Sequence, residues 1–215
     1  MSIHMRALAF AVITFLAGIG IGMLIEEQRM REIRETMLEL EALYNDARLL
    51  AKLLGEEFNA SFCDEMLKWN LEYNARIYEF GVRLDEYEKA NRFTPELEGQ
   101  KTLYNLLQFQ FLLNSIELKR KCNFTYKNVV HLYRRRGISL KEEVDTKTMA
   151  SILWDLKMRC GNKIMLIPLQ ADANLTSINA FLEKYQIRTY PATIIDDKAI
   201  EGLVSLSELI EICGC

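Results

Sequence analysis

Histidine is scarce in this 215-residue sequence, which has only His4 and His131. Transition-metal sites such as those for zinc are usually built from histidine and cysteine ligands at short, regular spacings. Neither histidine lies in such a spacing. We therefore expect no metal site based on histidine, and nothing in the sequence implies a cofactor.

An excess of positive charge is also lacking. The chain has 27 lysines and arginines against 30 aspartates and glutamates, for a net charge of −3. Proteins that bind nucleic acid draw much of their affinity from basic side chains that neutralise phosphates. We therefore expect no nucleic-acid partner. The length leaves room for one ordinary domain plus a further segment.

Residues 7–25 form an apolar run, ALAFAVITFLAGIGIGMLI, that carries no charge. A helix over this run would be about 28 Å long, close to the thickness of a bilayer core. We predict an N-terminal segment, 1–25, that contains a transmembrane helix and acts as an uncleaved signal-anchor. A cleaved secretory signal, whose apolar core is usually about 7–15 residues, and a buried soluble helix are the alternatives.

The glycines within this run and the arginines beside it bear on how the helix would associate and which way it would point. Gly18 and Gly22 form a G-x-x-x-G pattern, which allows two membrane helices to approach closely and suggests a possible homo-oligomer. Arg6 alone precedes the run, whereas three arginines follow it closely. The positive-inside rule would then keep the rest of the chain at the cytoplasmic face of the membrane.

Three N-x-[ST] sequences favour the opposite side, because this pattern accepts N-linked glycans. The candidate glycosylation sites are Asn59, Asn123 and Asn174. Five cysteines are also compatible with an oxidising compartment. We expect a single-pass protein whose soluble part is extracytoplasmic, with the cytoplasmic face as the alternative.

Residues 26–121 read as a helical region of the hairpin or three-helix kind, with coiled-coil-like spacing. Apolar residues recur at intervals of three and four, which places them on one side of a helix. A first stripe continues to Leu54, where Gly55 ends it. The second stripe is Cys63, Met66, Asn70, Tyr73, Ile77, Phe80, Leu84 and Tyr87, and the third is Leu103, Leu106, Leu107, Gln110, Leu113 and Ile116.

Residues 122–215 have a mixed pattern. Runs of β-branched and aromatic residues predict strands at 128–133, 163–169, 192–195 and 199–204. Helical patterns cover 139–160, 175–185 and 205–213. This β-α-β-α-β-β-α order predicts a mixed sheet with helices on both faces, and an α+β class for the whole chain.

This last region resembles the thioredoxin-like family. The resemblance covers roughly residues 125–213 and lies in Asp172, the helix sequence FLEKY, the segment IRTYPAT at 187–193, the turn at 196–198 and Gly202. It implies a cis peptide bond between Tyr190 and Pro191. It also implies that the backbone at Thr189 and Tyr190 pairs with an extended peptide, so we treat Thr189, Tyr190 and Pro191 as binding candidates.

The sequence departs from that family where a redox-active member carries Cys-x-x-Cys at the start of a helix. Here residues 134–139 read RRRGIS, and no cysteine lies between Cys122 and Cys160. The usual dithiol chemistry therefore has no nucleophile. Arg134, Arg135 and Arg136, next to a helix start, are candidates for binding an anion or a carboxylate. The alternative is a solvated loop, neutralised by the nearby Glu142, Glu143 and Asp145.

The cysteines offer two other uses. Cys213 and Cys215 form the only close pair, which could cycle between dithiol and disulfide or supply metal thiolates. The implied fold instead places Cys160 and Cys213 at the ends of two helices on one face of the sheet, within reach of a disulfide. Cys63 and Cys122, near the ends of the helical region, are a second candidate pair, which would leave Cys215 unpaired.

These observations favour a membrane-anchored, redox-inactive thioredoxin-like protein that acts as an interaction or scaffold module. Its expected partners are the membrane and other proteins or extended peptides. The alternative is an atypical thiol–disulfide oxidoreductase or redox chaperone that uses Cys213 and Cys215.

Overall fold

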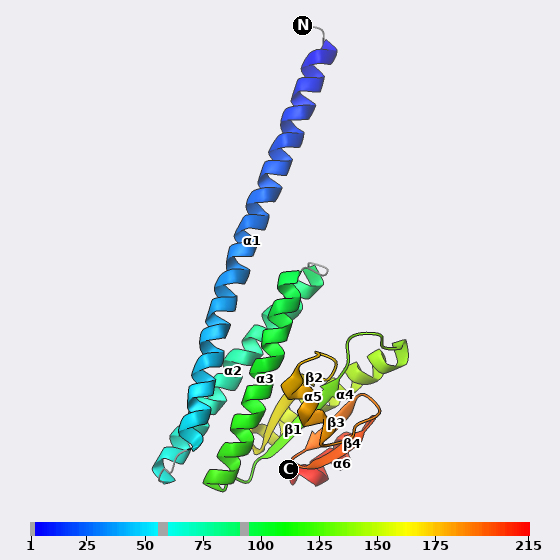
Figure 1. Cartoon of the computed structure of the whole chain (residues 1–215). Coiled ribbons are helices and arrows are strands. Elements are labelled where there is room, and N and C mark those ends of the chain that lie inside the picture. The colour runs from blue at the N-terminus through cyan, green and yellow to red at the C-terminus, as the bar shows by residue number, and fades with distance from the viewer. Residues whose placement is uncertain (1–2, 56–59, 91–94) are drawn as a thin grey trace. The chain divides into compact units, whose positions relative to one another are not determined.

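The chain has a mixed α+β fold in which three long helices precede a small αβ part (Figure 1). The structure, a computed structural model, describes residues 3–55, 60–90 and 95–215. The elements are α1 (Ile3–Gly55), α2 (Ala60–Ala90), α3 (Pro95–Cys122), β1 (Lys127–Tyr133), α4 (Leu140–Cys160), the short 3-10 helix η1 (Gly161–Lys163), β2 (Ile164–Gln170), α5 (Thr176–Glu183), β3 (Ala192–Ile195), β4 (Lys198–Glu201) and α6 (Leu206–Cys213). The predicted order of helices and strands is confirmed.

Two compact units make up the chain, Met1–Ala42 and Leu43–Cys215. The second unit contains the end of α1, the helices α2 and α3 and the whole αβ part. All of the contacts discussed below lie within this second unit.

The predicted transmembrane helix is not supported. Over the part of the chain that the structure describes, no helix is long and apolar enough to cross a membrane. The transmembrane helix at 7–25, the signal-anchor role and the single-pass membrane localisation are therefore wrong.

The predicted apolar stripe of α2 is confirmed. Its buried members are Met66, Asn70, Tyr73, Ile77, Phe80 and Leu84. The stripe predicted for α3 is wrong, because Leu113 and Ile116 are exposed whereas Phe109, Phe111 and Leu112 are buried. α3 packs against α2 and also against β1 and β2, so it is buried along more than one side and a single stripe does not describe it.

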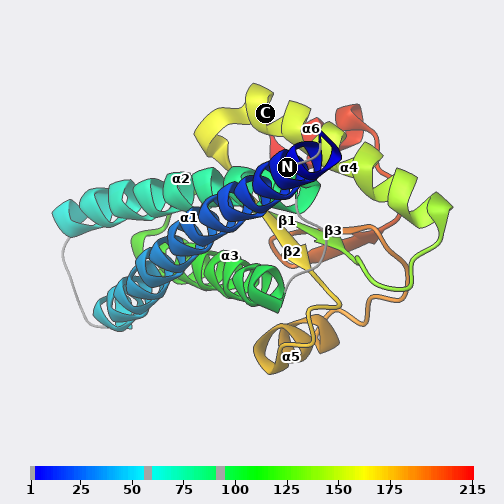
Figure 2. The same ribbon diagram turned by 90° about the horizontal axis from the view of Figure 1, so that it is seen from above.

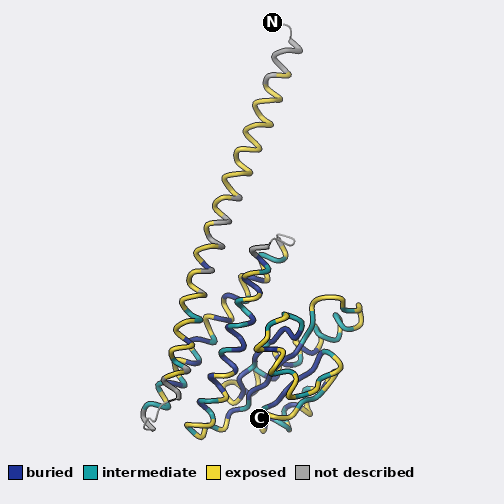
Figure 3. The backbone as a smooth tube through the Cα atoms, in the orientation of Figure 1, coloured by how far each residue is buried: buried dark blue, intermediate teal, exposed yellow. Residues whose placement is uncertain are grey.

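The sheet has the strand order β2-β1-β3-β4. β1 and β2 are parallel, whereas β3 runs antiparallel to both β1 and β4. Figure 2 shows α4 and α6 on one side of this sheet and α5 on the other. Core side chains from α4 and α6, such as Leu153 and Leu209, pack with Val129 of β1, and Figure 3 shows the buried residues concentrated in the strands and in α2 and α3.

Candidate functional site

The loop between β1 and α4 contains the three consecutive arginines that the sequence singled out. We call residues 134–138 the arginine loop. The main-chain N–H groups of Arg135 and Arg136 donate to Asp172 Oδ2, at 3.0 and 2.7 Å. Partial burial raises the pKa of Asp172, but these N–H groups outweigh it and hold that pKa below its usual value. Asp172 follows β2, so the loop is fixed to the end of the neighbouring strand.

Each arginine of the loop faces a carboxylate of the same chain. Arg134 donates twice to Glu142, at 2.8 and 2.7 Å. Arg135 forms an ion pair with Glu88, and Arg136 donates to Glu98 at 2.9 Å. Glu142 was expected from its nearness in sequence. Glu88 and Glu98 precede their partners by 47 and 38 residues, and no local pattern identified them.

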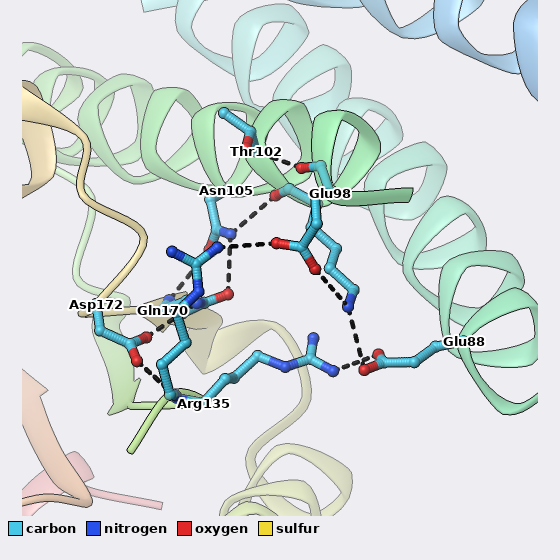
Figure 4. A network of polar contacts seen from close by, with 9 residues as sticks. Glu88, Glu98, Thr102, Asn105, Arg135, Gln170 and Asp172 are labelled. Carbon is cyan, nitrogen blue, oxygen red and sulfur yellow. Dashed lines mark hydrogen bonds and ion pairs between the residues drawn. The ribbon is translucent and has the colours of Figure 1, made fainter. Parts of the chain in front are cut away.

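The pairs of Arg135 and Arg136 belong to a polar network that joins α2 and α3 to the αβ part (Figure 4). Lys101 donates to Glu88 and Glu98 at 3.1 and 3.2 Å. Nearby, the side chain of Asn105 accepts from the main-chain N–H of Gln170 at 3.1 Å. Arg135 and Arg136 thus form a joint between the αβ part and the helices α2 and α3. Whether the arginine loop also binds an anion stays a prediction.

Charge within the network is balanced by the ion pairs. For Glu88, burial raises the pKa, but the hydrogen bond and charge of Arg135, followed by those of Lys101, lower it overall. For Glu98 the same balance holds, with Lys101 and Arg136 as the partners that lower its pKa. Both carboxylates are therefore ionised at neutral pH and maintain their ion pairs with Lys101 and the arginines. A cleft of about 650 Å³ lies beside the network.

The peptide bond between Tyr190 and Pro191 is cis, as the family resemblance implied. The main-chain N–H of Thr189 donates to Glu201 Oε2 at 2.8 Å, and the threonine hydroxyl donates to the same carboxylate. This hydroxyl is the main cause of the lowered pKa of Glu201. The N–H of Thr189 is therefore already paired within the chain, a contact that the sequence did not reveal.

Tyr190 is the residue of this loop that remains open to a partner. Among the residues that the structure describes, its main-chain groups have no hydrogen-bond partner. Its half-buried ring lies under the guanidinium of Arg134, at 5.1 Å from the ring centroid. The arginine loop and the cis-proline loop thus meet at Arg134 and Tyr190, whereas Pro191 itself is buried. Whether this surface binds a partner stays a prediction.

The cysteines form two disulfides. One joins Cys63 to Cys122, the pair suggested by their places near the ends of the helical region. The other joins Cys160 to Cys215, whereas we expected Cys160 to pair with Cys213. Gly214 adopts a left-handed conformation at the end of α6, with φ of 69°. The chain therefore turns back so that Cys215 reaches Cys160, and Cys213 stays a buried free thiol.

The alternative redox pair, Cys213 and Cys215, is thus not a dithiol in this structure, because Cys215 is bonded elsewhere. Burial also raises the pKa of the Cys213 thiol, which lowers its content of reactive thiolate at neutral pH. Among the described residues no group of three or more histidine, cysteine or acidic side chains is placed to hold a metal ion.

The glycosylation candidates lie in different surroundings. Asn123 and Asn174 are exposed and adopt positive φ values of 54° and 57°, a conformation that asparagine tolerates better than most residues. Asn59 lies outside the described residues. Glycan attachment stays a prediction.

Comparison with known proteins finds similarity in structure only. No family model and no curated protein matches the sequence. Among solved structures, chloroplastic thioredoxin z is 15% identical, with a TM-score of 0.35, and the match covers 46% of this chain and 85% of that one. Thioredoxin-2, a component of malaria parasite protein secretion machinery, is also 15% identical, with a TM-score of 0.32 and coverage of 41% and 82%. The mixed sheet and the cis-proline give the αβ part a thioredoxin-like fold, and these weak likenesses carry no conclusion about activity.

Proposed function

We propose that this chain is a non-enzymatic interaction or scaffold module that binds other proteins through the surface around Tyr190 and Pro191. The observation that carries the proposal is the arginine loop. By the family resemblance, this loop stands where a dithiol would act, and the charges of Arg135 and Arg136 hold α2 and α3 against the αβ part. A loop that is tied down in this way favours a fixed binding surface over a site for thiol exchange.

The cysteines support the same proposal. Four of the five are used in disulfides that join distant parts of the chain, and the fifth is buried. An extended peptide would lie across the cis-proline loop and pair with the main chain of Tyr190. The Tyr190 ring and Arg134 above it would contact its side chains. The paired N–H of Thr189 limits this main-chain pairing to few hydrogen bonds, so side-chain contacts would supply most of the affinity.

A second candidate function is thiol–disulfide exchange, as an oxidoreductase or redox chaperone. One observation favours it. The free thiol of Cys213 is two residues from Cys215, a disulfide-bonded residue that is exposed. This function requires Cys213 or Cys215 to react with an external disulfide or dithiol.

Selection of phage-displayed random dodecapeptides on the full oxidised chain tests the first proposal. We expect selected peptides to bind Tyr190→Ala at least about tenfold more weakly, which is the size of effect seen for a central aromatic contact. Tyr185→Ala is the matched control, because Tyr185 is also half-buried and lies under a cation, Lys184, at 4.9 Å. Equal binding by the wild type and Tyr190→Ala would contradict this assignment of the surface.

The second function is tested in parallel by reduction of insulin in the presence of dithiothreitol. We expect no rate above that of dithiothreitol alone. A catalysed rate that disappears in Cys213→Ser would establish the exchange function instead.

A further inference from the structure

β2 lies at an edge of the sheet, where one row of its main-chain groups faces away from β1. Along a strand, the main-chain N–H and C=O groups of successive residues point alternately to one side and to the other. The N–H of Gln170 points outward to Asn105 Oδ1, and the carbonyl of Ile164 points outward to Lys157 Nζ at 2.8 Å. Leu166 and Pro168 lie an even number of residues from both, so the N–H and carbonyl of Leu166 and the carbonyl of Pro168 must also face outward. Proline has no N–H, so Leu166 carries the one outward donor between the two ends that are already paired.

The described part of the chain supplies no partner for this Leu166 donor. Leu166 and Pro168 are also only half-buried, whereas the other residues of β2 are buried. An unpaired stretch of sheet edge is a template for an added strand.

A groove of about 600 Å³ lies along this edge, between α2 and α4, and Leu166 and Pro168 contribute to its lining. Two exposed aromatic rings contribute to its lining, Tyr78 from α2 and Trp154 from α4, and they stack with 5.8 Å between their centroids. Met158, which is 68% exposed, lies on the same side as Trp154. The groove therefore combines an open strand edge with large apolar side chains.

The polar groups of the groove also point to a particular occupant. Among the described residues that line it, Lys157 is the only charged one, and its ammonium already donates to the carbonyls of Gly161 and Ile164. Gln108 is 3% exposed and donates to the Tyr104 hydroxyl, but its Oε1 has no partner within the described residues. A buried acceptor without a donor is costly, and a peptide N–H would satisfy it without bringing a charge.

We propose that this groove binds an extended, uncharged and apolar segment of a partner protein, which adds to β2 as a further strand. The segment would pair with the outward N–H and carbonyl of Leu166 and donate an N–H to Gln108. One large apolar side chain would pack against Trp154 and Met158. Strand addition of this kind gains affinity from main-chain hydrogen bonds and specificity from the pocket. This surface is distinct from the one at Tyr190.

The test is fluorescence anisotropy of the full oxidised chain with a fluorescein-labelled heptapeptide of alternating valine and leucine, flanked by lysines. We expect saturable binding that is at least about tenfold weaker in Trp154→Ala. Val144→Ala is the matched control, because Val144 is an exposed apolar residue of α4 outside the groove lining. Tyr190→Ala should bind as the wild type does, which separates this site from the cis-proline surface.

The strand geometry is tested separately. Leu166→Pro removes the outward N–H at a position where the bonds to β1 do not depend on it, and we expect a larger loss of affinity than for Leu166→Ala. A heptapeptide with alternate N-methylated amides should bind at least about tenfold more weakly, and this arm does not depend on any variant folding.

Three binding results would overturn the proposal. They are the absence of saturable binding, equal binding of the N-methylated peptide, and unchanged binding by a folded Trp154→Ala variant. Sedimentation of the wild type as a dimer that Trp154→Ala dissociates would also overturn it, because a second copy of this chain would then occupy the groove.

Discussion

Removal of the disulfide between Cys63 and Cys122 should destabilise the chain by an amount that its loop length sets. The bond joins the start of α2 to the end of α3 across 59 residues. In the chain-entropy account, closing a loop of this length lowers the entropy of the unfolded chain by about 14 cal/mol/K, or about 4 kcal/mol at 25 °C. The bond lies next to a small core of Met66 and Leu118, so we expect the helices of the variant to stay packed and the loss to come mainly from the unfolded state.

The measurement is urea unfolding of the double variant Cys63→Ala/Cys122→Ala against the wild type, followed by circular dichroism and by fluorescence. With a slope of about 2 kcal/mol/M, a loss of about 4 kcal/mol lowers the midpoint by about 2 M. The slope itself should rise, because the unlinked chain exposes more surface on unfolding. Cys160→Ala/Cys215→Ala opens a loop of 55 residues and should lose a similar amount. A loss below about 1 kcal/mol for the first variant, with coincident transitions, would refute the reasoning.

Other predictions concern the joint and the packing around it. In a double-mutant cycle followed by urea unfolding, Arg135→Gln and Glu88→Gln should show a coupling free energy of about 1 kcal/mol, because both side chains are about one-third exposed. Independent effects of the two substitutions would contradict a stabilising ion pair between α2 and the arginine loop. Because the pKa values of Glu88 and Glu98 are lowered in the folded chain, their stabilisation is complete above the unfolded value of roughly 4.3 and is lost as the pH falls through the folded values. The melting temperature of the wild type should therefore fall more between pH 5 and pH 3 than that of Glu88→Gln/Glu98→Gln, and parallel curves would count against the network. Gly81→Ala would place a Cβ 2.7 Å from the Tyr104 hydroxyl, so overpacking of about 1–3 kcal/mol should exceed the gain of about 0.5–1 kcal/mol that alanine gives a helix; a higher melting temperature would show that the ring moves freely.

The sequence predicted the order and approximate bounds of the helices and strands because these depend on short-range patterns. Spacing of three and four identified the stripe of α2, and Ser139 begins α4 as a capping residue, accepting from the N–H of Glu142 at 3.2 Å. The strands followed from their β-branched residues. The cis bond before Pro191 followed from the family resemblance and not from any physical pattern.

Contacts between distant segments could not be predicted in the same way. The partners of Arg135 and Arg136 lie on α2 and α3. Nothing in the local sequence distinguishes a glutamate that pairs with a distant segment from one on a solvated helix face. The choice of Cys215 over Cys213 depended on the turn at Gly214. The N-terminal apolar run was interpreted from its composition alone, and the structure does not support the span.

The central claim is that this thioredoxin-like fold serves binding and not thiol exchange. The most direct test is to equilibrate the full chain in glutathione buffers of increasing reducing power and to map its disulfides by mass spectrometry after quenching. The account predicts that Cys63–Cys122 and Cys160–Cys215 persist in a buffer whose redox potential is about −200 mV, because structural disulfides have reduction potentials below about −300 mV. The disulfides of glutaredoxins and protein disulfide isomerase exchange near −200 mV. Half-reduction of Cys160–Cys215 near that potential, or its conversion to a Cys213–Cys215 bond, would contradict the account.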